Sequence, residues 1–307
     1  YGHPKIDSSN FLLNISGLVK TPKEMSLEEL RRLGSTELVA GFECSGNSAR
    51  AMQGLVSNGR WSGVRLSTLL QAVGIKQSAR EVVFFGADSG IEKVEFRGRT
   101  YEVEQQYGRS ISIEQAMRAE PLLAMNLNNE PLSVHQGFPI RLLMPGWYGA
   151  PNVKWLSNIH VQRDPYLGKY QARWYRTLRS EIVGGKKVWK ETAITRMRLK
   201  SVVARITRFK DVHKVQGFVL NDGTPLRSVE VRVDDGSWQK ATVHPQDNKY
   251  SWKLFTYTWK SATPGEHTII SRVTDINGQV QPTREELTSK KTFLEDNSQH
   301  PRTVVIS

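Results

Sequence analysis

The only cysteine of the chain, Cys44, stands where an apolar run gives way to small residues. Phe42-Glu43-Cys44 ends the apolar run, and Ser45-Gly46-Asn47-Ser48 is typical of a turn. A strand that stops at such a cysteine presents a thiolate at the mouth of a loop, where it can hold a soft metal. A small hydrophobic role is the commoner use of a lone cysteine and stays open as an alternative. A nucleophile is a third reading, although no histidine base can be assigned to it from the sequence.

The cysteine count limits which metal the thiolate would bind. Structural zinc sites and iron–sulfur clusters need several cysteines, and this chain has one. One cysteine also excludes an internal disulfide and a CxxCH haem attachment. A single thiolate therefore leaves a metal whose other ligands come from a cofactor.

Two cations flank a glycine-rich turn in the stretch HQGFPIRLLMPGWYGAPNVKW, residues 135–155. Arg141 can bind a phosphate in a bidentate manner, and Lys154 can add a point charge. The pattern fits a phosphate clamp, and two surface cations beside a hairpin turn are the alternative. The chain has neither GxxxxGK[ST] nor GxGxxG, so ordinary nucleotide binding has no support.

A third candidate is Tyr175, within the run Arg173-Trp174-Tyr175-Arg176. Its hydroxyl could donate a hydrogen bond to a charged substrate. Interleaved basic and aromatic residues could instead stack on nucleic acid, or pack along the surface with their charged ends in solvent.

Short elements must position these residues. A capping box of Ser26 and Glu29 predicts a helix over residues 26–33, and Gly74 predicts the end of a helix over Leu66–Val73. Val39–Cys44 is a predicted strand. Further strands are expected at residues 11–19, 81–87, 122–127, 140–144 and 153–161, with a short helix at 112–117 and a meandering connection at 163–200.

The pattern changes near Lys200. Six short strands follow, separated by turn signals such as Asn277-Gly278, which is typical of an antiparallel β-sandwich of the immunoglobulin type. A length of 307 residues suits two domains. We therefore expect an α+β protein with a catalytic domain at residues 1–198 and an immunoglobulin-like β-sandwich at 199–307.

The charge balance points to an anionic partner. The net charge is +13, which favours nucleic acid, an anionic cofactor or substrate, or an acidic protein. No stretch approaches the ~20 apolar residues of a membrane span, and no signal-peptide pattern stands at the start. The compartment stays open on this evidence.

Several motifs in the same order resemble the sulfite oxidase family of molybdenum-cofactor enzymes. The resemblance covers nearly the whole chain. The motifs are Glu43–Asn47, Arg60–Leu66, Asp88–Gly90, Tyr107–Ile111, His135–Trp155, Ser228–Trp238 and Asp275–Pro282.

The resemblance implies a role for each matching residue. Cys44 would ligate a mononuclear molybdenum, and one molybdopterin per chain would supply further sulfur ligands. Arg141 and Lys154 would bind the pterin phosphate, and Tyr175 would face the substrate. Asn47, Asp88, Ser110 and His135 are the other expected cofactor-binding residues. The second domain would serve dimerisation.

The chain also departs from the family pattern. Sulfite-oxidising members carry an arginine five residues after the cysteine, where this chain has Ala49, and Arg50 follows as the candidate active-site arginine. The segment expected to supply another arginine reads Ser289-Lys290-Lys291-Thr292. The short loop between Gly46 and Arg60 is more similar to bacterial members, including the sulfane dehydrogenase of the sulfur-oxidising system.

The resemblance implies an oxidoreductase that transfers an oxygen atom to sulfite or a related inorganic sulfur anion. Electrons would pass to a separate cytochrome, because the chain has no haem motif. We expect a homodimer or hetero-oligomer in the periplasm. We expect neither binding to nucleic acid nor a membrane-spanning segment. The alternatives are a molybdenum-dependent reductase of nitrate or a sulfoxide, and a non-catalytic basic binding module.

Overall fold

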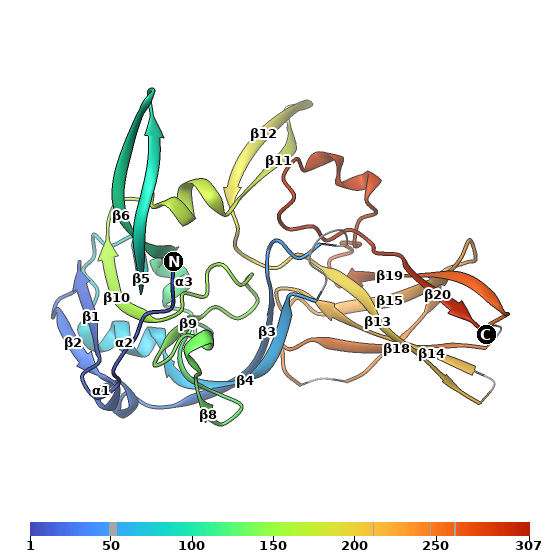
Figure 1. Ribbon diagram of the computed structural model, residues 1–307, viewed down its shortest axis with the longest axis horizontal. Helices are drawn as coiled ribbons and strands as arrows, with labels where there is room; N and C mark the ends of the chain where they lie inside the picture. The colour runs from blue at the N-terminus through green and yellow to red at the C-terminus, as the bar shows by residue number, and fades with distance from the viewer. Residues whose placement is uncertain (49–53, 211, 246, 261) are drawn as a thin grey trace. The chain divides into compact units, whose positions relative to one another are not determined.

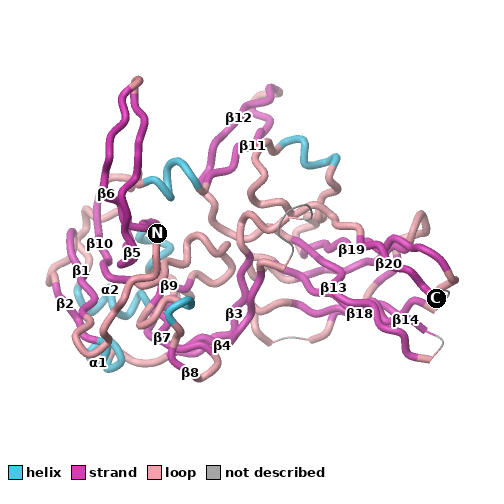
Figure 2. The backbone as a smooth tube through the Cα atoms, in the orientation of Figure 1, coloured by secondary structure: helices cyan, strands magenta, loops and turns pink. Residues whose placement is uncertain are grey.

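The computed structural model describes residues 1–48, 54–210, 212–245, 247–260 and 262–307. The chain divides into two compact units. The first holds residues 1–38, 59–145 and 150–176, and the second holds residues 39–58, 146–149 and 177–307. The described part of the chain is mostly β-structure with three short α-helices (Figure 2). The division between residues 198 and 199 stays a prediction.

The first unit contains a five-stranded sheet whose longest strands form a hairpin. The strand order is β2 (Lys23–Ser26), β1 (Leu12–Gly17), β10 (Leu156–Gln162), β5 (Glu81–Phe96) and β6 (Arg99–Ser112). The β1 and β10 strands are parallel, and the other pairs are antiparallel. The β5–β6 hairpin continues well past the end of β10 (Figure 1).

A second sheet has the order β3 (Thr36–Glu43), β4 (Val56–Arg65), β7 (Leu122–Leu127) and β8 (Glu130–Pro131), with β9 (Arg141–Leu143) paired to β7. The β7–β9 register places Arg141 opposite Ala124. Both residues are buried, so this register carries a cation into the interior of the first unit.

The helices begin and end as their local sequences require. The α1 helix (Leu27–Arg32) starts at Ser26 with both hydrogen bonds of the capping box. The α2 helix (Leu66–Val73) ends at Gly74, whose φ of 66° favours glycine. The α3 helix (Ile113–Ala116) is capped by Ser112. A 3₁₀-helix, η1 (Val134–Gln136), and a π-helix, η2 (Tyr170–Trp174), lie in the loops of the first unit.

The second unit is built on two four-stranded antiparallel sheets. One has the order β13 (Lys200–Phe209), β14 (Val212–Leu220), β18 (Lys253–Trp259) and β17 (Thr242–Val243). The other has the order β16 (Gln239–Lys240), β15 (Leu226–Val233), β19 (Gly265–Asp275) and β20 (Arg302–Ile306). Side chains of both sheets share one apolar core, including Val215, Phe255, Val231 and Ile269. The immunoglobulin type and the dimerisation role stay predictions.

Residues 163–200 are more regular than the sequence indicates. Besides the π-helix they form a two-stranded hairpin of β11 (Arg176–Val183) and β12 (Lys186–Ala193), joined by Gly184 and Gly185. Both glycines have positive φ, as a tight hairpin turn requires. The expected meandering connection was therefore wrong. A further 3₁₀-helix, η3 (Glu285–Ser289), precedes the C-terminal strand.

None of the helices in the described ranges is both long and apolar enough to span a membrane.

Candidate functional site

The Cys44 loop presents its thiol to solvent from a firmly held backbone. Cys44 is exposed, whereas Glu43, Ser45 and Asn47 are buried. The backbone N–H of Cys44 donates to the Leu55 carbonyl at 3.0 Å, and that of Asn47 donates to the Cys44 carbonyl at 2.9 Å. These bonds close a tight turn with the sulfur on its outer side, as the sequence predicted for a loop after a strand.

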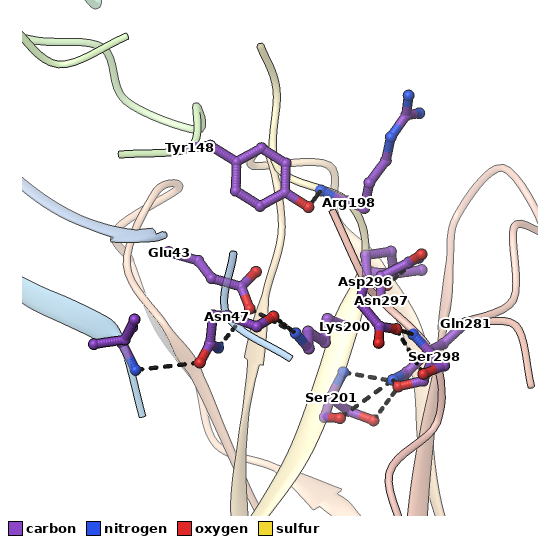
Figure 3. Close-up of polar contacts among 12 residues, drawn as sticks. Glu43, Asn47, Tyr148, Arg198, Lys200, Ser201, Gln281, Asp296, Asn297 and Ser298 are labelled. Atoms are coloured by element: carbon purple, nitrogen blue, oxygen red, sulfur yellow. Dashed lines mark hydrogen bonds and ion pairs between the residues drawn. The ribbon is translucent and has the colours of Figure 1, made fainter. Parts of the chain in front are cut away.

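A buried ion pair lies directly behind the loop (Figure 3). The Lys200 ammonium donates to Glu43 Oε1 at 2.6 Å and to the Asn47 carbonyl at 3.1 Å. Asn47 Nδ2 donates to the same Glu43 oxygen at 2.7 Å. Burial raises the pKa of the Glu43 carboxyl, and the charge of Lys200 opposes that shift. Sequence reasoning missed this pair, although an acidic residue within an apolar strand was a signal.

The other side of the loop is held by backbone bonds. The N–H of Glu295 donates to the Ser45 carbonyl at 2.7 Å, and that of Gly149 donates to the Glu43 carbonyl at 2.8 Å. The Glu295 carboxylate accepts from Arg179 at 3.0 Å and is nearly fully buried. The loop therefore sits on a rigid support within the second unit.

A basic cavity of about 510 Å³ opens beside the loop. Its lining residues are Ser48, Arg284, Leu287, Lys290, Lys291, Thr292, Phe293 and Asp296. An ideal Cβ on Gly46 would lie 3.8 Å from the Phe293 ring and 3.9 Å from Cys44 Sγ, so ring and thiol both flank Gly46. Phe293 is 74% exposed. The cavity thus contains the Lys290-Lys291 segment, which the resemblance matches to an arginine-bearing segment of the family.

The first unit brings the two predicted clamp residues together. Arg141 is only 6% exposed, and its guanidinium donates to the carbonyls of Gln136 and Asn152 at 2.9 and 3.1 Å. Lys154 donates to the His135 carbonyl at 3.2 Å. Burial lowers the pKa of Arg141 to about 10. Burial and the charge of Arg141 lower the pKa of Lys154 as well. Two desolvated cations that repel each other favour a bound anion.

Three other predicted residues lie in the first unit. Asp88 is buried, which raises the pKa of its carboxyl against the charge of Lys154. Ser110 is buried, and its Oγ has no hydrogen-bond partner within the described part of the chain. The exposed His135 ring lies 3.3 Å from His3, measured between Nδ1 and Nε2. Polar groups of several kinds therefore accompany the cation pair.

Gly137 permits the close packing of this cation pair. Its φ is 104°, and an ideal Cβ there would lie 2.9 Å from Lys154 Cβ. Only a glycine satisfies both the backbone conformation and the space. The glycine of the HQGFP run is thus a packing requirement of Lys154.

Tyr175 belongs to an aromatic cluster around a buried cation. The Tyr170 ring lies 6.3 Å from that of Tyr175 and 4.5 Å from that of Tyr107, between centroids. Arg109 is fully buried and donates to the Tyr170 carbonyl at 2.5 Å. Burial raises the pKa of Tyr107, and the charge of Arg109 opposes this. The sequence analysis placed both residues within the Tyr107–Ile111 motif but assigned a role to neither. Arg109 lies opposite the buried Phe84 in the β5–β6 register, and this pairing becomes visible only in the structure.

The predicted residues fall into two groups. Asp88, Ser110, His135, Arg141, Lys154 and Tyr175 lie in the first unit, whereas Cys44 and Asn47 lie in the second. Arg50 lies outside the described residues. Within the described ranges, no three His, Cys, Asp or Glu side chains gather where they could hold a metal ion.

Comparison with known proteins identifies the class. The family model "Oxidoreductase molybdopterin binding domain" matches residues 1–170. The chain therefore belongs to the sulfite oxidase family of molybdopterin oxidoreductases, and it is an enzyme. Membership of this family implies a molybdenum cofactor.

Individual relatives agree with this class. The sulfite oxidase of Arabidopsis thaliana is 25% identical over 89% of this chain and 77% of its own length. The mitochondrial sulfite oxidase of Rattus norvegicus is 26% identical over 91% of this chain. The chain spans 54% of that relative, so about half of its length. A nitrate reductase of Ulva prolifera is 30% identical over 56% of this chain and 20% of its own length.

A solved structure has the same fold. The sulfane dehydrogenase SoxCD from Paracoccus pantotrophus matches with a TM-score of 0.81 at 24% identity. The match covers 100% of this chain and 80% of that one.

The residues present fit the family's cofactor. The paired Arg141 and Lys154 suit a pterin phosphate, and the orphaned Ser110 hydroxyl is available to a further polar group. Cys44 offers one exposed cysteine sulfur, the type of donor that a soft metal prefers.

Proposed function

We propose that the protein oxidises a small inorganic sulfur anion, such as sulfite, at a molybdenum held by Cys44. The observation that carries this proposal is the basic cavity beside the Cys44 loop, which includes Lys290 and Lys291. Two cations at that position offset the charge of an entering anion. Ser48 of the Cys44 loop lines the cavity, and the Phe293 ring of the cavity and the Cys44 thiol both lie beside Gly46.

The residues of the chain have distinct roles in this proposal. Arg141 and Lys154 would hold the phosphate of one molybdopterin per chain, with Asn47, Asp88, Ser110 and His135 as further proposed contacts. When bound, the metal supplies oxygen-atom transfer and two-electron redox chemistry. Lys291 would attract and orient the anion. By the family resemblance, Tyr175 would face the substrate.

Oxidation of sulfite to sulfate takes up one oxygen atom from water and releases two protons and two electrons. We infer that the electrons pass one at a time to a separate cytochrome. The 307 residues themselves contain no CxxCH haem motif. The structural neighbour, a sulfane dehydrogenase, supports the choice of a sulfur substrate. A dimer or hetero-oligomer, an immunoglobulin-like dimerisation domain and a periplasmic location are proposals that rest on the family resemblance.

Steady-state assays test the substrate class. We expect sulfite or thiosulfate to be oxidised with a one-electron mediator, and nitrate and methionine sulfoxide not to be reduced. Nitrate is included because part of this chain is similar in sequence to a nitrate reductase. Turnover of nitrate or the sulfoxide alone would reverse the proposed direction of electron flow.

The variant Lys291→Met tests the role of the cavity. We expect its KM for the sulfur anion to rise about 10-fold, since an interaction with a charged group contributes ~1.5 kcal/mol. Lys240→Met, which removes an exposed lysine of β16, is the matched control and should leave KM unchanged. An equal KM in both variants would show that the cavity does not bind the substrate.

A further inference from the structure

We propose that Lys200 and Glu43 are positioning residues that fix the Cys44 loop for metal binding. The β-sandwich unit, through the first residue of β13, thereby controls how firmly the metal is held. The inference rests on Cys44 being the metal ligand, and it does not depend on which substrate is oxidised.

The contacts of Lys200 enclose the cysteine. Its ammonium lies 2.6 Å from the side chain of Glu43, which precedes Cys44, and 3.1 Å from the carbonyl of Asn47, which follows it by three residues. Asn47 Nδ2 reaches back to the same Glu43 oxygen at 2.7 Å. One cation therefore joins the two ends of the turn, as Figure 3 shows. Loss of this cation removes the one donor that both ends share, and leaves the Asn47–Glu43 hydrogen bond to join the two side chains.

The burial of Lys200 and Glu43 indicates that this ion pair orients the Cys44 loop and adds little net stability. The side chains of Lys200 and Glu43 are 7% and 1% exposed. Apolar residues of similar volume often give equal or greater stability than a buried ion pair, because both charges must be desolvated. An apolar pair could not form the two hydrogen bonds that Lys200 makes here. Only a donor can bind the Asn47 carbonyl and the Glu43 carboxylate at the same time.

A second ion pair in the same unit provides a comparison. Arg272 and Glu230 lie 2.9 Å apart on neighbouring strands, with side chains 30% and 22% exposed. Within the described residues, neither Arg272 nor Glu230 forms a hydrogen bond with the Cys44 loop. Removing it perturbs the sandwich without touching the turn, which makes it a matched control.

The test compares two double variants of the full chain, Glu43→Gln/Lys200→Met and Glu230→Gln/Arg272→Met. The double change at the loop leaves no unpaired buried charge, so it keeps the fold where Lys200→Met alone could lose it. Molybdenum per chain is measured after dialysis of the holoprotein. We expect about 10-fold less molybdenum in the loop variant than in the wild type or the control, the scale on which indirect contacts alter metal affinity.

A second readout uses the single cysteine. In protein made without the cofactor, a thiol reagent reports on Cys44 alone. We expect the labelling rate in the loop variant to differ several-fold from the wild type, because the exposed thiol loses its fixed position on the turn, and we expect wild-type labelling in the control. Wild-type labelling and molybdenum retention in the loop variant, even with a lower Tm, would overturn the proposal. Neither readout depends on turnover. A wrong substrate assignment can therefore be told apart from a wrong assignment of Lys200 and Glu43.

Discussion

Cys44 is the exposed member of an otherwise buried run, and this alternation explains how one residue is offered to a ligand. Glu43 and Ser45 point inward, where the carboxyl and the backbone carbonyl are held. The side chain between them has solvent on its outer side. The thiol is available because its neighbours are fixed.

The variant Lys154→Met tests the phosphate clamp that Arg141 and Lys154 form in the first unit. Loss of its charge removes one of two cations from a desolvated position. We expect purified protein to carry about 10-fold less pterin, measured by fluorescence after acid release, since a charge-assisted contact contributes ~1.5 kcal/mol or more. Lys93→Met, on the exposed part of the β5–β6 hairpin, is the control. Equal pterin in both variants would contradict the clamp.

Several residues of the two site regions could be predicted, and others could not. Cys44, Arg141 and Lys154 stood beside turn-forming residues and so were visible in the sequence. Lys200 lies 157 residues from its partner Glu43, and only the fold brings the two together. Arg109 is buried by the register of β5 and β6, which a single strand does not encode.

At the scale of elements, the helices were the most predictable parts because their end signals are local. The Ser26–Glu29 capping box and Gly74 placed α1 and α2 almost to the residue. The outer halves of β5 and β6 were missed, since they are exposed and carry charged residues such as Lys93 and Glu102. Apolar periodicity, the main signal for a strand, is weak where nothing packs on it.

Ser26→Ala tests the capping box of α1. The change removes the acceptor for the Glu29 N–H, so we expect a loss of about 1 kcal/mol in the free energy of unfolding. Denaturant unfolding measures it, with Ser8→Ala in an exposed turn as the control. A loss equal to that of Ser8→Ala would show that the cap contributes nothing.

The β-sandwich should respond to pH through His267. Its hydrogen bond to Asp234, 2.8 Å between Nδ1 and Oδ2, raises the pKa of His267 above its usual 6.5 and lowers that of Asp234 below 3.8. The His267–Asp234 pair therefore stabilises the folded state fully at pH values between 3.8 and 6.5, the ordinary pKa values of the two groups. It is lost as the pH rises through the raised pKa of His267.

The variant Asp234→Asn measures this stabilisation. We expect the Tm difference between wild type and variant to be larger at about pH 5.5 than at about pH 9. Asp235→Asn, one residue further along the exposed turn, should show no such pH dependence. A difference that grows with pH would have the wrong sign for this ion pair.

At the scale of the molecule, the sequence pattern indicated the family and the change of character near Lys200, because motif order and strand length persist over long stretches. The structure adds two four-stranded sheets around one core in the second unit, and a mixed five-stranded sheet in the first. The net charge of +13 is consistent with an anionic cofactor and substrate.

Elemental analysis of freshly purified holoprotein tests the proposal that Cys44 holds the molybdenum of an active oxidoreductase. We predict about one molybdenum per chain in the wild type, and loss of sulfite or thiosulfate oxidation in Cys44→Ser, which lacks the soft thiolate. Less than about 0.1 molybdenum per chain in the wild type, together with a fully active Cys44→Ser variant, would show that Cys44 is not a molybdenum ligand.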